Sequence, residues 1–175
     1  GSFRLAVVAE QALGGRAALR QFAASVRDDF DLIPLNGYVL DTTDPDATYN
    51  QLPADLRRTD LADAIARGGK PAGGLYLVQF AGPIQDEWLQ ALAATGVEVV
   101  AYVPSNAYIV RGNAKAALAL IRFAKRHQIV QFIGDYEPSF KLSPSVRATR
   151  EKGSEVIDIT VQVIAGASHA LFPEQ

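Results

Sequence analysis

Hydrophobic and polar positions alternate with two different periods between residues 75 and 133. Four short apolar runs, rich in β-branched and aromatic residues, predict strands. These runs cover 75–80, 97–103, 107–111 and 129–133. Apolar residues recur three or four positions apart over 84–95 and 113–126, which predicts two amphipathic helices. Gly96 suits the end of the first helix and Asn113 the start of the second, so the predicted order is β-α-β-β-α-β.

This order predicts an α+β fold. Six elements in about 60 residues are typical of a ferredoxin-like βαββαβ sandwich, in which two helices cover one face of a four-stranded antiparallel sheet. Right-handed crossovers place the first and third strands in the centre of that sheet and the second and fourth at its edges.

The N-terminal part predicts an α/β extension. A strand is expected over 3–9 and an amphipathic helix over 16–30. Residues 32–40 read as strand on both sides of the Asn36-Gly37 turn, and the polar stretch 41–50 reads as a loop. A short helix over 60–66, ended by Gly68-Gly69, precedes a Pro- and Gly-containing linker.

The C-terminal part predicts an extended stretch over 136–144, a charged loop over 147–153 and a fifth strand over 155–164. We therefore expect an N-terminal extension with its linker, a ferredoxin-like domain, and either the start of a further unit or an added strand. These regions are 1–73, 74–144 and 145–175.

Strand periodicity divides the predicted sheet into two faces. The uncharged face is expected to pack on the helices. It contains Tyr76, Val78, Phe80, Val97, Val99, Ala101, Val103, Tyr108, Val110, Val130 and Phe132. The outer face is mostly apolar, with polar groups interspersed. It contains Leu75, Leu77, Gln79, Glu98, Val100, Tyr102, Ile109, Arg111, Ile129, Gln131 and Ile133.

An apolar outer face needs a cover, because monomers seldom expose large apolar patches. One interpretation is that residues 1–70 or the fifth strand cover it within the chain. The other is a protein-binding face. The docking residues predicted for that face are Leu77, Gln79, Glu98, Val100, Tyr102, Ile109, Arg111 and Gln131.

The composition offers little catalytic chemistry. The chain of 175 residues has no Cys and only two His, so thiolate nucleophiles, disulfides and Cys-based metal sites are excluded, and no cofactor or metal is expected. A formal net charge of −2 argues against a nucleic-acid partner. His127 and the acid pair Asp86-Glu87 suit helix ends, where their charges complement the helix dipole. The apolar runs are too short to span a membrane.

Several segments together resemble the N-terminal pro-region of large subtilisin-like serine proteases of bacteria and archaea. They are Tyr76–Ile84, Trp88-Leu89, Gly96, Tyr102–Arg111, Phe132–Pro138 and Lys141–Pro144. The resemblance extends over about 52–144. It implies a secreted or cell-envelope protein whose pro-domain helps the catalytic domain of the same polypeptide to fold and inhibits it until processing.

The resemblance also implies that an open sheet face packs on the catalytic domain, which agrees with the apolar outer face. The catalytic motifs of that protease class are missing from this chain, so the domain itself is expected to be inert. The chain opens with Gly1-Ser2, as a tag-derived fragment would. Two alternatives are a protein-interaction or spacer domain of an exported protein and a small-molecule-binding ferredoxin-like regulatory domain.

Overall fold

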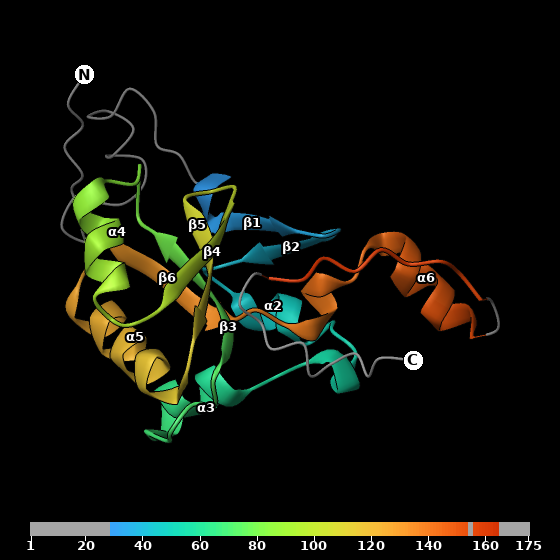
Figure 1. The fold of residues 1–175 in the computed structure, drawn as a ribbon, viewed down its shortest axis with the longest axis horizontal. Coiled ribbons are helices and arrows are strands. Elements are labelled where there is room, and N and C mark those ends of the chain that lie inside the picture. Colours follow the sequence, from blue (N-terminus) through green and yellow to red (C-terminus); the bar gives the residue numbers. More distant parts are fainter. Residues whose placement is uncertain (1–28, 154–155, 165–175) are drawn as a thin grey trace, which may run out of the picture.

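The computed structural model describes residues 29–153 and 156–164 and has an α+β architecture with two antiparallel sheets (Figure 1). Its strands are β1 (Leu32–Leu35), β2 (Tyr38–Asp41), β3 (Gly74–Phe80), β4 (Glu98–Val103), β5 (Ala107–Gly112) and β6 (Val130–Asp135). Its α-helices are α2 (Pro45–Tyr49), α3 (Asp60–Arg67), α4 (Asp86–Ala93), α5 (Ala114–Arg126) and α6 (Pro144–Lys152). Short 3-10 helices lie at Asp29–Asp31, Ala54–Leu56 and Pro138–Lys141.

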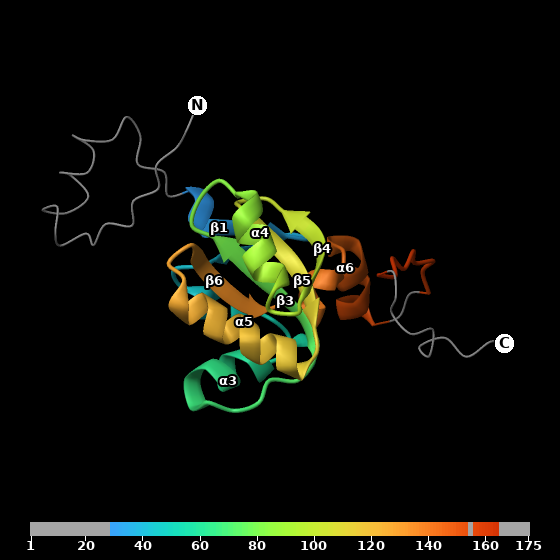
Figure 2. The ribbon, with the colours of Figure 1, turned by 60° about the vertical axis from the view of Figure 1, so that its left-hand side comes forward.

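The larger sheet has the strand order β4-β5-β3-β6, and every neighbouring pair in it is antiparallel. Strands β3 and β5 are therefore central, where the crossover rule places them. Helices α4 and α5 lie across one face of this sheet, and α3 lies beside α5 (Figure 2). Asn113 caps α5 as predicted, because its side chain accepts a hydrogen bond from the Ala116 amide at 3.0 Å.

The helix-covered face forms the larger of two apolar clusters. Fully buried side chains of β3 meet the apolar stripes of α4 and α5 there, as the helical and strand periods predict. Its buried members are Leu61, Ala64, Tyr76, Val78, Phe80, Leu92, Val97, Val110, Ala116, Ala117, Leu120, Ile121 and Phe123. No helix in the described residues is long and apolar enough to cross a membrane.

The β1–β2 hairpin packs on the opposite face of the sheet. Its turn is made by Asn36 and Gly37, both with positive φ, as the Asn-Gly signal predicts. Together with Phe140 it covers the middle of the sheet and forms the second apolar cluster. The buried members of this cluster are Ile33, Leu35, Leu40, Leu52, Leu77, Val103, Ala107 and Phe140.

Two irregularities in strand pairing alter the predicted faces. The register shifts between Val99 and Ala101 in β4, so Val103 points into the hairpin-side cluster and not toward the helices. A second shift, where β6 pairs with Gln79 and Phe80 of β3, exchanges the faces of Phe132 and Ile133. An extra residue in one strand inverts the alternation beyond it, which a simple period-2 assignment does not detect.

The predictions about the flanking regions fall partly outside the described residues and are partly wrong. The predicted strand over 3–9 and nearly all of the helix over 16–30 lie outside the described residues. The polar stretch 41–50 contains helix α2, which begins at Pro45, a residue suited to the first helical turn. The extended stretch 136–144 contains a 3-10 turn at Pro138–Lys141.

The C-terminal prediction is also wrong. The supposed charged loop is helix α6, which starts after a Ser143 cap followed by Pro144 and ends at Gly153 with φ 74°. The predicted fifth strand over 155–164 is not observed. Its described part, 156–164, belongs to no helix or strand. Figure 1 shows this segment, in red, running from the far end of α6 back toward the sheet.

Candidate functional site

The predicted docking face is only partly accessible. Leu77 and Gln79 are fully buried under the hairpin, so neither is available to a partner. The Gln79 amide donates to the carbonyls of Phe30 and Ser105, at 2.5 and 3.0 Å, and thereby holds the hairpin base on the sheet. These two residues of the predicted interface are corrected to internal contacts of the fold.

Two further predicted interface residues also contact the hairpin. Gln131 is exposed, but its amide donates to Asp31 Oδ1 at 2.7 Å and to Thr42 Oγ1 at 3.3 Å. Ile109 is half-buried against the hairpin-side cluster. The hairpin therefore covers this face of the sheet from β6 to β5.

The other predicted interface residues lie at the β4 side of the sheet. Tyr102 is 59% exposed, and its ring stands edge-on to that of Tyr108, with centroids 5.5 Å apart. Arg111 pairs with Glu98 at 2.5 Å, and Val100 is half-buried. Because β4 has only one neighbouring strand, this side of the sheet remains open to solvent.

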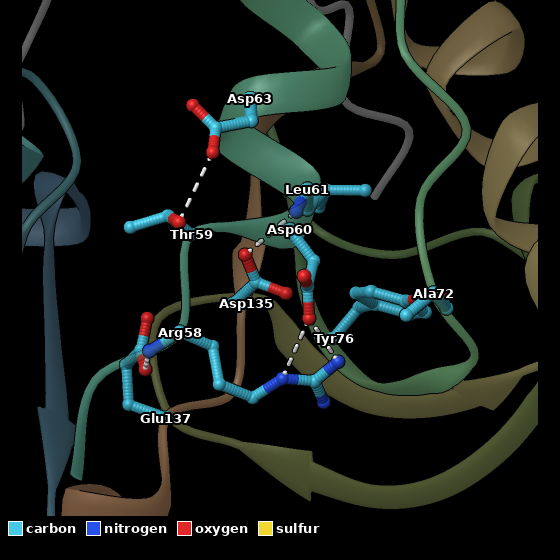
Figure 3. Close-up of polar contacts among 9 residues, drawn as sticks. All are labelled: Arg58, Thr59, Asp60, Leu61, Asp63, Ala72, Tyr76, Asp135 and Glu137. Carbon is cyan, nitrogen blue, oxygen red and sulfur yellow. Dashed lines mark hydrogen bonds and ion pairs between the residues drawn. The ribbon is translucent and has the colours of Figure 1, made fainter. Parts of the chain in front are cut away.

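Two buried acids, absent from the predicted site, lie where β6 meets the start of α3 (Figure 3). Asp135 Oδ2 accepts a hydrogen bond from the Leu61 amide at 2.9 Å, and Glu137 Oε2 accepts one from the Arg58 amide at 2.5 Å. Both acids are at least 97% buried, since their exposed fractions are 3% and 1%. Asp135 supplies the acceptor that the N-cap residue Thr59 does not provide, and Glu137 holds the amide just before that N-cap.

The nearby guanidinium does not neutralise these acids directly. Arg58 directs its side chain to Asp60, with Nε and Nη2 lying 3.0 and 2.5 Å from Oδ2 (Figure 3). The pKa of Glu137 is raised to about 7, mainly by burial and also by the Asp135 charge, which together outweigh the lowering effect of the hydrogen bond from the Arg58 amide. Burial also raises the pKa of Asp135. Asp135 Oδ1 has no hydrogen-bond partner among the described residues.

A cavity of about 260 Å³ follows the outer edge of β6. Tyr49 and Asn50 at the end of α2 line one side, and Ala62 and Ile65 of α3 line another. Tyr49 Oη donates a long hydrogen bond, 3.5 Å, to the Asp135 carbonyl, which therefore points away from β3. Helices α2 and α3 thus flank this edge of the sheet.

The chemistry of this region is that of a structural junction. Each acid uses one oxygen to hold a backbone amide of the α3 approach, and no group of three or more His, Asp or Glu able to hold a metal occurs in the described residues. The only sign of this junction in the sequence is a pair of acids, Asp135 and Glu137, at the end of an apolar strand. That signal is weak, because their amide partners are more than 70 residues earlier in the chain.

The remaining sequence candidates occupy ordinary positions. His127 is the C-cap of α5, and Asp86 and Glu87 lie in the first turn of α4. Both placements agree with the helix-dipole interpretation. His169 lies outside the described residues.

The segment from Val156 to Ile164 has the most exposed apolar surface in the described chain. Exposed fractions are 103% for Val156, 59% for Ile159 and 55% for Val161. Ile164, at the end of the segment, lines a groove with Glu98 and Arg111 of the sheet.

The family described as "Domain of unknown function (DUF8729)" matches residues 34–137. This chain belongs to that family. The match covers more than half of the chain and runs from within β1 to Glu137, so it includes most of the hairpin and both buried acids. No curated protein and no solved structure matches the chain.

Proposed function

We propose that this chain is a non-catalytic protein-binding domain and, within that class, the N-terminal pro-domain of a secreted subtilisin-like serine protease. The observation that carries the proposal is the extended apolar segment 156–164, which follows a folded module and lies exposed. An exposed run of β-branched residues is suited to pairing with a strand of another protein. The sequence resemblance over 52–144 selects the protease pro-domain from this class.

The ferredoxin-like architecture is part of the same proposal. In the unit from β3 to β6, two central strands are flanked by two edge strands, and both α4 and α5 lie on one face. We assign this unit to the ferredoxin-like class, with the β1–β2 hairpin as an addition on the other face. The hairpin occupies the surface on which docking was expected from the resemblance.

Docking on the catalytic domain therefore keeps only part of the predicted surface and adds a further segment. The accessible parts are the β4 side, with Glu98 and Tyr102, and the segment 156–164. Extended backbone in the segment would form main-chain hydrogen bonds with a strand of the protease. Its alternate Val and Ile side chains would then enter apolar pockets of the protease.

The test begins with the coding sequence that follows Gln175. We expect a downstream domain that carries the Asp, His and Ser of a subtilisin-like protease. That domain is refolded with and without this chain, and hydrolysis of a peptide substrate is measured. The full chain should raise the refolding yield and slow hydrolysis, whereas a chain ending at Gly153 should not inhibit. Lack of both effects, or of such a downstream domain, would contradict the proposal.

The cavity beside β6 favours a second candidate, a small-molecule-binding regulatory domain. Its volume of about 260 Å³ and its mixed lining, which includes Arg57 and Tyr49, suit a small polar ligand with an apolar part. Thermal unfolding in a panel of metabolites tests this candidate, because a ligand of the folded state raises the Tm. Substitution of Ala62 by Leu, which narrows the cavity, should abolish such a shift.

A further inference from the structure

The two edges of the four-stranded sheet differ in how they are covered. Along β6, Tyr49 of α2 bonds to the outward Asp135 carbonyl, and α3 lies on the other side of the same cavity. Along β4, only Val103 is buried, and the other five residues are exposed or half-buried. An open edge strand presents unpaired backbone groups that favour the addition of another strand.

The apolar side of this open edge is defined by the strand register. Val99 pairs with Val110, and Tyr102 pairs with Tyr108. Because paired residues share a face, Val99 and Tyr102 lie on the helix-covered side of the sheet. They are nevertheless 41% and 59% exposed, so the apolar cluster continues beyond the cover of the helices at this edge.

The segment 156–164 has the complementary pattern. As an extended strand it places Ile157, Ile159, Val161 and Val163 on one face, and Asp158, Thr160 and Gln162 on the other. The four apolar residues are 40–59% exposed. Placed alongside β4 with its apolar face toward the helix side, the segment would cover Val99 and Tyr102.

The segment does not reach β4 along its length within one chain. Ile164 touches the groove near Glu98 and Arg111, but the preceding residues run beside α6 and are exposed (Figure 1). Helix α6 is itself anchored, since Arg147 stacks 4.2 Å from the centre of the Tyr38 ring and Arg150 pairs with Asp55. Residues 156–163 are therefore exposed along their length in a single chain and are available to another sheet.

We propose that the segment 156–164 of one chain adds as a strand to the β4 edge of a second copy, so that two chains exchange segments. A symmetric exchange covers both open edges and both apolar segments at once, and such exchange is a low-cost route to dimers. The inference goes beyond the proposed function and concerns the chain on its own, because a bound protease would occupy the same segment and β4 edge. It is tested without any protease, so its failure leaves the proposed function untouched.

Sedimentation of the full chain over a range of concentrations gives the first readout. We expect a dimer, and a chain ending at Gly153 should be monomeric with an unchanged far-UV spectrum. Ile159→Pro should also be monomeric, because proline removes a ladder donor. Ile159→Thr keeps the β-branched shape and the amide and should still dimerise. A full chain that stays monomeric, or a dimer that survives the truncation, would overturn the proposal.

Disulfide trapping identifies the partner strand, and the absence of native Cys leaves the introduced thiols unambiguous. A chain carrying Tyr102→Cys is mixed with chains carrying Ile159→Cys, Val161→Cys or Val163→Cys and oxidised. We expect a cross-linked heterodimer for at least one of these positions. Gln162→Cys lies on the opposite face and is the matched control, expected to cross-link weakly. A chain that carries both Tyr102→Cys and one of the segment substitutions is oxidised as well. If it forms only a disulfide within the same chain, the segment pairs with its own sheet and the proposed exchange is wrong.

Discussion

The carboxylate of Asp135, at the end of β6, accepts a hydrogen bond from the backbone amide of Leu61 in the first turn of α3, with 2.9 Å between Oδ2 and N. This bond joins residues 74 positions apart. It caps α3 from the sheet, because no side-chain cap is made by Thr59 at the local N-cap position. The position of α3 on the sheet edge thus depends on an acid in β6.

Asp135→Ala is predicted to destabilise the fold by about 1 to 2 kcal/mol, since it leaves the buried Leu61 amide without an acceptor. Asp135→Asn should cost less, because its amide oxygen still accepts that bond. Asp63→Ala is the matched control, since it removes only exposed contacts on the same helix, the pair with Arg67 and the hydrogen bond from the Thr59 hydroxyl. Urea unfolding followed by circular dichroism gives the three values. An equal loss for Asp135→Ala and Asp63→Ala would contradict the capping role.

The raised pKa of Glu137 predicts a stability that falls as pH rises. Its pKa is about 7 in the folded chain against an ordinary value of 4.5, so the folded state binds the proton more tightly. Between these two values unfolding releases protons, and the free energy of unfolding decreases by up to about 3 kcal/mol as pH increases. Asp135, whose pKa burial also raises, adds to the same slope.

The measurement is urea unfolding at pH values between 4.5 and 7, with Glu137→Gln as the comparison. The glutamine oxygen still accepts the Arg58 amide but carries no charge, so this variant should show a flatter pH dependence than the natural chain. Its gain in stability should be largest at the upper end of the range. A variant with the same slope as the natural chain would show that Glu137 does not titrate in this window.

The parts of the fold predicted from sequence are those whose burial follows a local period. The strands from β3 to β6, and α3, α4 and α5, each carry an apolar stripe or run that decides which face is buried. The Asn36-Gly37 turn was recognised from another local signal, because its two positive φ values favour those residue types. Local rules were sufficient to place these elements along the chain, but they did not predict the register shifts that exchange faces in β4 and β6.

The predictions that failed depend on partners distant in the chain. Residues 155–164 have the strand alternation, but a strand also needs a neighbour, and none is assigned for the described part of this stretch. Leu77 and Gln79 were named as docking residues in one of two interpretations, and the other, cover by residues 1–70, is the one found, because the hairpin lies over them. The sequence did not choose between the two because the hairpin lies more than 30 residues earlier. The capping acids were missed because their partners are backbone amides, which have no sequence signature.

Gly134 is predicted to resist substitution for a packing reason. A Cβ at this position in β6 would collide with Tyr49 Oη and the Phe132 ring. Gly134→Ala should therefore cost about 1 to 3 kcal/mol through overpacking. Tyr49→Phe in the same chain removes the hydroxyl and should recover part of the loss. Thermal unfolding of both single variants and the double variant measures the coupling, and strict additivity would argue against this collision.

The two apolar clusters predict an order of sensitivity to side-chain truncation. Phe140 is fully buried in the hairpin-side cluster, with the rings of Tyr38 and Tyr136 at centroid distances of 5.6 and 6.0 Å. Trp88 is only half-buried against Phe80, with 5.7 Å between centroids. Phe140→Ala should cost about 3 to 5 kcal/mol and Trp88→Ala about 2 to 3, because the cost scales with the buried volume lost.

Urea unfolding of the two variants tests this order, and the Trp88 variant is followed by circular dichroism because it lacks the single tryptophan. The Phe140 ring also stands edge-on to the ring of Tyr38 in β2, so the side chain holds the hairpin directly. Its truncation should therefore also loosen the hairpin, and exchange of the β1–β2 amides with solvent should accelerate in that variant alone. If Trp88→Ala proves the more damaging change, the hairpin is an accessory to the sheet and contributes little to its stability.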